Sequence, residues 1–408
     1  MDREAARRQL LEIYASALRA VAGDELVRKQ LLTEPIGARC CVVAIGKAAE
    51  AMAVGAQQAL GPQLQRGLLI TKHGYMSRPF DARWTCIEAG HPLPDDDSLK
   101  AGALLLEFLH NTPADCHLLF LISGGTSSLA EVLPEGVSAD TLHRTNQWLL
   151  ASGLDIASMN RVRKRLSAIK AGRLASHLHD HAVTQLLLSD VPGNDPHVIG
   201  SGLLVPHLQA DVDTDYLSLP AWLEDALQQS PPLADSVHFS HITTHLLATN
   251  RTLRLAAQHE AEQRGLPVVS YDFDFQGDAA LLGHEFARAM LDGRPALHIW
   301  GGEATVKLPS HPGRGGRCQH LALSAAMHLA GSGGALLAAG SDGSDGPGED
   351  AGALVDGGTV ERGELEGIKA TRALSEADSG TFLEASGDLI QTGPTGSNVM
   401  DLVLGLKL

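Results

Sequence analysis

Two hydrophobic patterns alternate along the chain, and their order predicts the fold class. Short continuous runs of apolar residues are typical of strands that are buried on both faces of a sheet. Segments with apolar residues at helical spacing lie between these runs. In the first half, strands are expected at 40–46, 67–72, 84–90, 118–123 and 183–190. The order strand, glycine turn, helix predicts a parallel sheet with ligands at the carboxyl ends of its strands.

The alternation is interrupted by residues 206–240, which are rich in Pro, Asp, Ser and Gln and have weaker periodicity. We interpret this stretch as a connection and place the domain boundary at residue 235. The sequence therefore predicts an α/β fold of two domains, 1–235 with a mostly parallel Rossmann-like sheet and 236–408 with a second α/β arrangement. Helix is expected over most of 141–180 and over 370–386.

Composition describes an ordinary soluble globular protein and narrows its partners. Of 408 residues, 44% are hydrophobic and 20% are charged, with a net charge of −16. An acidic chain argues against a nucleic-acid or anionic-membrane surface. A site for an anionic substrate must therefore concentrate its cations locally.

The cysteines and the N-terminus indicate the compartment. The five scattered cysteines fit buried thiols better than a disulfide framework or a zinc site; they are Cys40, Cys41, Cys86, Cys116 and Cys318. The first 21 residues form an amphipathic helix pattern without the features of a signal peptide. No apolar run approaches the roughly 18–20 residues that span a bilayer. We expect a cytoplasmic protein.

The stretch GGEATVKLPSHPGRGGRCQ concentrates candidate chemistry. Gly301 and Gly302 are expected to release the backbone at the end of a strand and to place Glu303 at a turn. Arg314 and Arg317 lie among glycines immediately before a helix, whose first N–H groups are expected to be unpaired. Two guanidiniums beside such N–H groups predict a phosphate or carboxylate site. The alternative is a flexible surface loop with solvated arginines.

Other polar groups follow predicted strands. Lys47 comes directly after a strand and a glycine, although a solvated lysine at a helix start would give the same pattern. The loop SGGTSS is a candidate anion cradle, since successive backbone N–H groups and hydroxyls suit a phosphate. The loop residues concerned are Ser123, Gly124, Gly125, Thr126 and Ser127. An ordinary tight turn is the alternative.

Acidic residues near strand ends suggest a metal or a hydroxyl-orienting group. Asp190, in the turn that also contains Asn194, is a candidate for either role, and a helix cap or Asx turn is the alternative. Asp342 and Asp345 supply the hard oxygen ligands that Mg²⁺ prefers, unless they form a solvated acidic loop.

The basic helical stretch is the most cationic part of this acidic chain, and a solvated helix face explains it equally well. Its cations are Arg161, Arg163, Lys164, Arg165, Lys170 and Arg173.

No GxxxxGK[ST] motif and no GxGxxG fingerprint is present, so the P-loop and nicotinamide-binding patterns are excluded. The residues alone indicate an α/β enzyme for a small phosphorylated or carboxylated anion.

The motifs together resemble the D-glycerate 2-kinases that carry a MOFRL domain, over nearly the whole length. The resemblance rests on these segments: 44–53, 71–75, 88–98, 121–129, 160–175, 186–202, 301–319, 338–356 and 392–402. It implies phosphorylation of the 2-hydroxyl of D-glycerate by ATP with a divalent metal such as Mg²⁺. It also implies a C-terminal MOFRL-type domain and an active site in the cleft between two domains.

Carried over motif by motif, the resemblance assigns the transferring phosphate to Lys47 and Arg317. Asp190 is then expected to orient a hydroxyl or bind the metal, with Glu303 as a further metal candidate. The loop around Gly124 is expected to hold either the glycerate carboxylate or a nucleotide phosphate. The chain departs from the family pattern at three places: the loop 123–128, Cys318, and the segment GLLVPHL.

Two rival functions are also compatible with the sequence. One is a hydroxypyruvate reductase that uses NAD(P)H, which the missing nicotinamide fingerprint disfavours. The other is a non-catalytic protein that binds a sugar acid, which would not need Lys47, Arg317 and several acids together. The expected partners are D-glycerate and ATP, without nucleic acid or membrane. Homo-oligomerisation is left open.

Overall fold

The computed structural model describes residues 2–37, 39–179, 181–231 and 239–407, which form two compact units. The parallel-sheet unit is Gly23–Leu247. In the mixed-sheet unit, the first 22 residues join the chain from Ala248 onward. The predicted boundary at residue 235 lies outside the described residues. The expectation that the N-terminal helix belongs to the first domain is wrong.

The parallel-sheet unit is built on six strands in the order β3-β2-β1-β4-β5-β6. Their bounds are β1 Cys40–Ile45, β2 Leu64–Lys72, β3 Trp84–Ala89, β4 His117–Ile122, β5 Val183–Leu188 and β6 Ile242–Ala248. The pairs β3–β2, β2–β1, β1–β4 and β4–β5 are parallel. Every residue of β1 is buried, as its continuous apolar run predicts. The parallel sheet expected for this half is confirmed.

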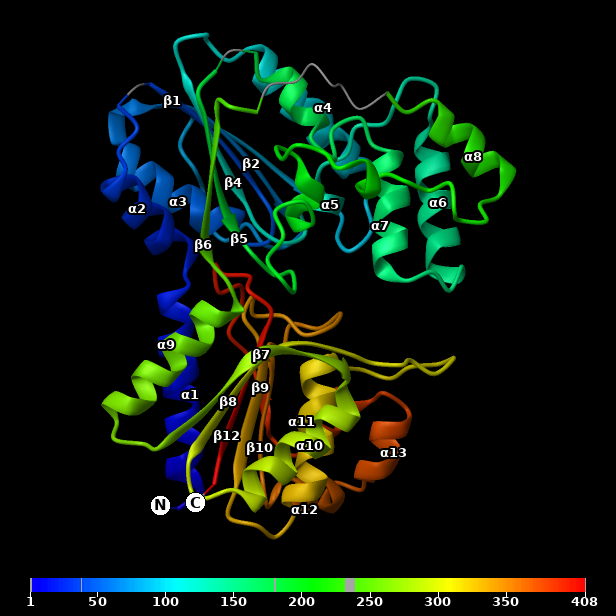
Figure 1. The fold of residues 1–408 in the computed structure, drawn as a ribbon. Helices are drawn as coiled ribbons and strands as arrows, with labels where there is room; N and C mark the ends of the chain where they lie inside the picture. Colours follow the sequence, from blue (N-terminus) through cyan, green and yellow to red (C-terminus); the bar gives the residue numbers. More distant parts are fainter. Residues whose placement is uncertain (1, 38, 180, 232–238, 408) are drawn as a thin grey trace. The chain divides into compact units, whose positions relative to one another are not determined.

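Helices cover both faces of this sheet, with α2 and α3 on one face and α4 and α5 on the other (Figure 1). The bounds are α2 Gly23–Thr33, α3 Ala49–Leu60, α4 Asp96–His110, α5 Thr126–Leu129, α6 Ala139–Ala151, α7 Ile156–Arg165 and α8 Ala221–Gln228. Short 3₁₀ turns occupy Gly61–Gln63, Arg173–His177, Ile199–Gly202 and Gln209–Asp211. Apolar side chains of α6, α7 and α8 form a small core of their own.

The basic stretch is less helical than its periodicity suggests. Helix α7 ends at Arg165, and the backbone turns through left-handed conformations at Ala171 and Gly172. The N–H groups of these two residues donate to the carbonyls of Ser201 and Gly202, at 3.0 and 2.7 Å. A tertiary contact therefore replaces helical hydrogen bonds there. The connection 206–240 also contains α8, which its weak pattern concealed.

The mixed-sheet unit has six strands in the order β11-β10-β9-β12-β8-β7. They are β7 Val268–Asp278, β8 Leu297–Thr305, β9 Ala335–Gly340, β10 Gly352–Asp356, β11 Leu389–Ile390 and β12 Asp401–Leu406. Only the β7–β8 pair is parallel among the pairs described, and the other four are antiparallel. The chain thus folds into two α/β domains, the second with a mixed sheet.

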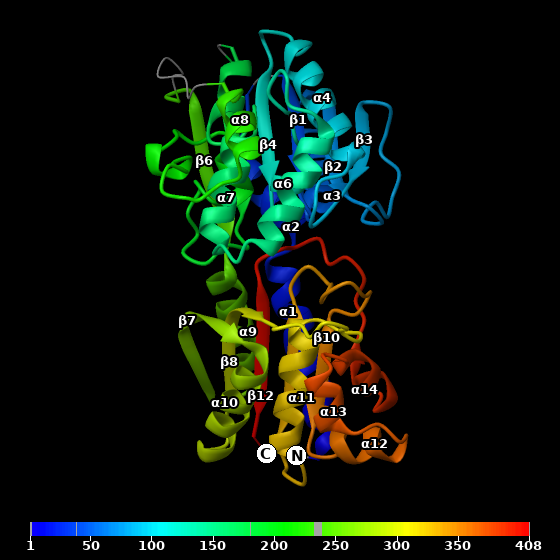
Figure 2. The same ribbon diagram turned by 90° about the vertical axis from the view of Figure 1, so that its right-hand side faces the viewer.

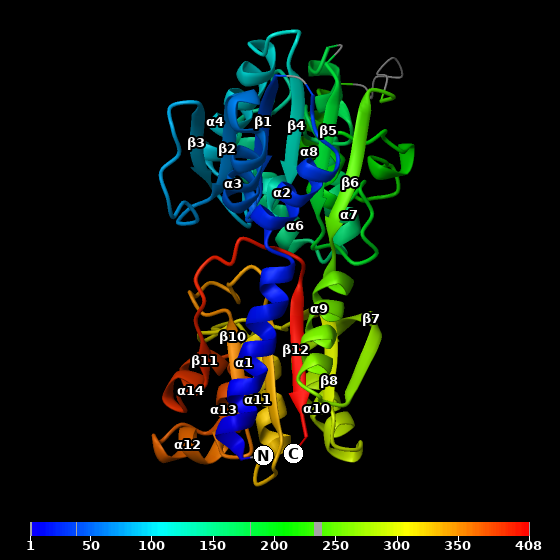
Figure 3. The same cartoon turned by 90° about the vertical axis from the view of Figure 1, so that its left-hand side faces the viewer.

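Seven helices described in this unit lie around its sheet. They are α1 Arg3–Ala20, α9 Asn250–Gln263, α10 Ala279–Asp292, α11 Arg317–Leu329, α12 Thr359–Leu365, α13 Ala370–Ser375 and α14 Ser379–Ala385. Figure 2 shows α10 and α11 toward the viewer, and Figure 3 shows α1 along β12 on the other face. The single helix expected over 370–386 is interrupted at Ala377, which has a positive φ of 51°.

Helix α1 joins this unit because its apolar stripe is buried there. Leu10, Ile13 and Ala17 are fully buried, and the hydroxyl of Tyr14 donates to the carbonyl of Gly340 at 2.7 Å. Arg7 pairs with Asp356 at 2.7 Å. Local periodicity predicts the helix, but only these distant contacts decide its domain.

The glycines after ALHIW do not end strand β8, contrary to the expectation. The strand continues to Thr305, with Gly302 paired to Asp401 and Glu303 paired to Gln276. A Cβ at Gly301 would lie 1.8 Å from Oδ1 of Asn250. Glycine is needed here for close packing and not for a turn. No helix in the described ranges is long and apolar enough to cross a membrane.

Candidate active site

The carboxyl edge of the parallel sheet brings the Lys47 turn against the loop after β4. The backbone N–H of Lys47 donates to the carbonyl of Gly124 at 2.9 Å, and that of Ala48 donates to Oγ of Ser123 at 3.0 Å. Gly46 has a φ of 132°, and a Cβ there would lie 2.1 Å from the same hydroxyl oxygen. The two strand ends are thus locked together.

Gly125 is the point at which Lys47 approaches the loop. Its φ is 89°, and a Cβ there would lie 3.3 Å from Cγ of Lys47 and 3.2 Å from Cδ2 of His91. Glycine leaves this backbone accessible between the two side chains. The structure therefore brings Lys47 and the predicted anion cradle together.

The hydroxyls of that loop have different roles. Ser123 and Thr126 are buried, and Oγ1 of Thr126 donates to the carbonyls of Ile45 and Ser123, at 2.9 and 2.7 Å. These two side chains hold the strand ends together and are not among the described lining of the neighbouring cavity. Ser127 hydrogen bonds with Ser201 at 2.7 Å and lines a cavity.

That cavity encloses about 310 Å³ and lies wholly within the parallel-sheet unit. Gly124, Gly125, Ser127 and Asp190 line it, so four predicted site residues share one space. Asn194 adopts a left-handed turn conformation and does not belong to the described lining. The volume is at the lower end of the range for small-molecule pockets.

The cavity also contains residues that the sequence had not assigned to a site. Asn146, Asn160, Arg163 and Lys170 contribute to its wall. Lys170 forms a buried ion pair with Glu131, whose other oxygen accepts from Ser167 at 2.6 Å. For Arg163 and Lys170, the sequence feature that could have indicated this wall was the density of basic residues. A solvated helix face predicts the same density, so the sequence did not decide between the two.

In the mixed-sheet unit, Arg317 is held by carboxylates. Its Nε and Nη2 donate to the two carboxylate oxygens of Asp401 at 2.6 and 2.8 Å, and Nη2 lies 3.1 Å from Glu303. Burial opposes the charged form, but the attraction of Asp401 and Glu303 outweighs it and raises the pKa of Arg317. Nη1 is the guanidinium nitrogen that Asp401 does not engage. Asp401 was not among the predicted site residues.

The N–H groups at the start of α11 are not unpaired, contrary to the expectation. The backbone N–H groups of Cys318 and Gln319 donate to the two carboxylate oxygens of Asp345, at 2.9 and 2.8 Å. Burial raises the pKa of Asp345 to about 7, although these two hydrogen bonds act to lower it. An internal carboxylate thus takes the place expected for a bound anion.

Arg314 is also engaged by acidic groups. Nη1 reaches Glu384 at 2.5 Å and Nη2 reaches Asp350 at 3.3 Å. Its backbone N–H donates to Asp378 at 2.8 Å, which fixes the glycine-rich loop 313–316. Beside this loop lies a second cavity of about 220 Å³, lined by Arg317, His320, two glycines of the loop and apolar residues of β8 and beyond.

The predicted metal ligands do not form a ready cage. Asp345 serves the helix start, Oδ1 of Asp342 accepts from Ser344 at 3.0 Å, and Glu303 faces Arg317. Mg²⁺ in phosphoryl-transfer sites often uses one or two carboxylates, substrate phosphates and water. Asp190 lies in the wall of the parallel-sheet cavity, whose described lining does not include these three carboxylates.

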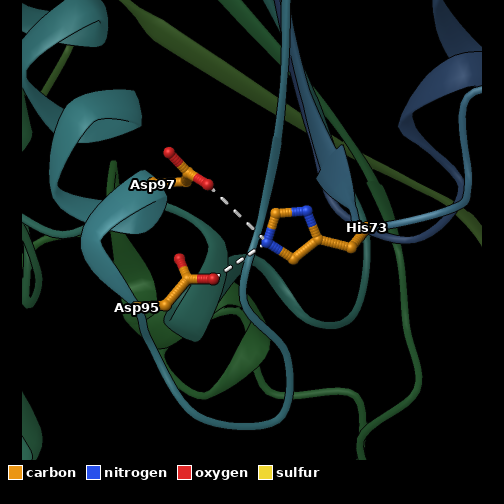
Figure 4. Close-up of side chains that lie close together, drawn as sticks. All are labelled: His73, Asp95 and Asp97. Atoms are coloured by element: carbon orange, nitrogen blue, oxygen red, sulfur yellow. Dashed lines mark hydrogen bonds and ion pairs between the residues drawn. The ribbon is translucent and has the colours of Figure 1, made fainter.

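One group with metal-ligand spacing occurs among the described residues, and helix capping explains it. Nε2 of His73 lies 2.8 Å from Asp95 and 3.9 Å from Asp97, and Figure 4 shows both carboxylates turned toward the imidazole. Asp95 caps α4 by accepting from the N–H of Ser98 at 2.9 Å. Burial would raise the pKa of Asp95, but hydrogen bonds from His73, Ser98 and Gly90 lower it to about 2.

Two family models match the chain. The model described as "Domain of unknown function (DUF4147)" matches residues 9–219, and the model described as "MOFRL family" matches residues 296–401. Together they cover most of both units.

Individual relatives cover nearly the whole chain. A D-glycerate 2-kinase from Thermotoga maritima is 35% identical over 99% of this chain and 99% of its own. A protein from Agrobacterium vitis that carries a hydroxypyruvate reductase name is 35% identical over 89% of this chain and 98% of its own. The crystal structure of a glycerate kinase from Thermotoga maritima matches with a TM-score of 0.86 at 34% identity, covering 99% of this chain and 100% of that one. The chain therefore belongs to the glycerate 2-kinase family whose members carry a MOFRL region.

Proposed function

We propose that this protein transfers the γ-phosphoryl group of ATP to the 2-hydroxyl of D-glycerate, giving 2-phospho-D-glycerate and ADP. The observation that carries the proposal is the cavity at the carboxyl edge of the parallel sheet. Gly124, Gly125 and Asp190 line it, and Lys47 lies against Gly125. Full-length similarity to proteins named glycerate 2-kinase and glycerate kinase supports the same activity.

The catalytic roles follow from what phosphoryl transfer requires. The protein must position two substrates and supply positive charge to the oxygens of the transferring group. We assign that charge to Lys47, whose side chain lies beside the loop at Gly124 and Gly125. Asp190 lines the same cavity, where a carboxylate can accept a hydrogen bond from the 2-hydroxyl and orient it.

We assign nucleotide phosphate contact to Arg317, which lines the cavity beside the glycine-rich loop. Asp401 orients its guanidinium through Nε and Nη2, so Nη1 is the nitrogen that is left for a phosphate oxygen. Arg314, which Glu384 and Asp350 engage, fixes the loop.

We assign the binding of Mg²⁺ to the carboxylate of Asp190, which lines the parallel-sheet cavity. When bound with the nucleotide, the metal would neutralise phosphate charge and align the oxygens. Glu303, Asp342 and Asp345 stay weaker candidates, because none of them belongs to the described lining of the parallel-sheet cavity.

A coupled assay for ADP tests the proposal. The purified protein is incubated with ATP, Mg²⁺ and D-glycerate, and ADP release is followed with and without the acid. Release that requires D-glycerate supports the kinase, and no acid-dependent release contradicts it. A parallel incubation with NADH or NADPH and hydroxypyruvate should show no cofactor oxidation. Oxidation there would instead support the reductase, and binding of the acid without either reaction would support a non-catalytic sugar-acid-binding protein.

A further inference from the structure

The parallel-sheet cavity contains a cation that the proposed phosphoryl transfer leaves unassigned. Arg163 of α7 lines this cavity together with Asn146 and Asn160. Its Nε donates to Oδ1 of Asn146, and its Nη1 donates to Oδ1 of Asn160, both at 3.2 Å. Two neutral amides therefore orient the guanidinium.

The neutral partners distinguish Arg163 from the arginines of the glycine-rich loop. Arg317 is paired with Asp401, and Arg314 is paired with Glu384 and Asp350. In the cavity wall, Lys170 has Glu131 as its counter-ion. Arg163 has no such carboxylate within the part of the chain that the structure describes. Arg163 therefore differs from Lys170, the other cation named in this wall, because no carboxylate in the described structure balances its charge.

An unbalanced and half-buried charge favours an anionic ligand. Burial alone lowers the pKa of Arg163, with no attraction to an acidic group offsetting it. Removing a cation from water without a counter-ion is unfavourable, and a bound carboxylate would relieve that cost. The site therefore gains more from an acid than from a neutral polyol of the same size.

The donor geometry suits a carboxylate. A guanidinium has five N–H donors, and the two amides accept from two of them. Three donors are then left within the described structure, two on Nη2 and one on Nη1. These allow a bidentate contact with the two oxygens of one carboxylate, the geometry in which arginine binds such groups best.

We propose that Arg163 binds the carboxylate of the acid substrate, with Asn146 and Asn160 fixing the plane of its guanidinium. The inference rests on the proposed function and deepens it, because it makes Arg163 the residue that selects a hydroxy acid over a neutral polyol. It also assigns the glycine loop at Gly124 and Gly125 to the phosphoryl side of the reaction.

The test compares an acid substrate with its neutral amide. ADP release is measured with D-glycerate and with D-glyceramide for the wild type, Arg163→Gln and Arg163→Lys. Arg161→Gln is the matched control, because Arg161 lies on the same helix but donates to the carbonyl of Ala210 and lies over the ring of Tyr216. Thermal unfolding of each variant separates a binding defect from misfolding.

Arg163→Gln should lower kcat/KM for D-glycerate about 10- to 100-fold, the range expected for lost charged hydrogen bonds. Most of the loss should appear in KM. Turnover of D-glyceramide should change little, so the preference for the acid falls by a similar factor. Arg163→Lys keeps the charge without the bidentate geometry and should be intermediate. An unchanged preference in Arg163→Gln, or an equal loss in Arg161→Gln, overturns the inference.

Failure of the kinase proposal gives a different result. If the wild type releases no ADP with D-glycerate, titration calorimetry with D-glycerate tests the carboxylate site by itself. Binding that weakens in Arg163→Gln and not in Arg161→Gln then still supports the site. Absent binding, or binding that Arg163→Gln leaves unaltered, overturns it.

Discussion

We expect the ion pair between Arg317 and Asp401 to stabilise the mixed-sheet unit. The free-energy costs of removing its two charges should be strongly coupled. The side chain of Asp401 is 1% exposed and that of Arg317 is 30% exposed. Arg317→Met leaves Asp401 buried without its bidentate partner, a change that typically costs about 3–5 kcal/mol. Asp401→Asn should cost less, about 2–3 kcal/mol, because Glu303 still faces the arginine and solvent reaches it.

The double variant tests this reasoning. Because both charges are gone, its cost should fall short of the sum of the single variants by about 2 kcal/mol. Urea unfolding measures the three free energies. Trp300 lies in the core of the mixed-sheet unit and reports on it when Trp84, Trp148 and Trp222, which lie in the other unit, are replaced by phenylalanine. Costs that add to within about 0.5 kcal/mol would refute the coupling.

Three further predictions concern single groups. Lys47→Ala should lower kcat on the order of 10²–10³-fold with little change in melting temperature, measured by ADP release and calorimetry; near-normal kcat removes Lys47 from catalysis. Lys170→Met should destabilise the protein by about 3–5 kcal/mol in urea, because Glu131 is left buried and unpaired, and pairing it with Glu131→Gln should recover part of the loss. The pKa of Asp345 is about 7 in the folded state and near 4 in the unfolded state. Between pH 4 and 7 the folded state therefore binds more protons than the unfolded state, and the wild type loses stability as pH rises through that window. Relative to the wild type, Asp345→Asn should therefore gain up to about 1.4 kcal/mol per pH unit from pH 4 to 7, and a pH-independent difference would contradict the shift.

The parallel sheet, and the edge that carries the candidate site, were predictable because they depend on local pattern. Continuous apolar runs fixed the positions of β1 and β4, and the glycines after them indicated where the backbone turns. In a parallel sheet these ends meet at one edge, and in the structure Lys47 lies against Gly125 there.

The partners of the predicted residues could not be found from the sequence. Asp401 lies 84 positions from Arg317, and the carboxylate that caps α11, Asp345, lies 27 positions from Cys318. No periodicity relates such positions, since strand order in a mixed sheet decides which ends meet. The domain of α1 and the left-handed turn at Ala171 likewise depend on tertiary contacts.

The most direct test of the proposed activity is an enolase-coupled assay of the product. Enolase accepts 2-phosphoglycerate directly, so purified protein with ATP, Mg²⁺ and D-glycerate should give phosphoenolpyruvate absorbance without added phosphoglycerate mutase. Lys47→Ala should slow the appearance of that signal on the order of 10²–10³-fold. Absorbance that appears only after mutase is added would show phosphorylation at the 3-hydroxyl. No absorbance, with or without mutase, would contradict the kinase.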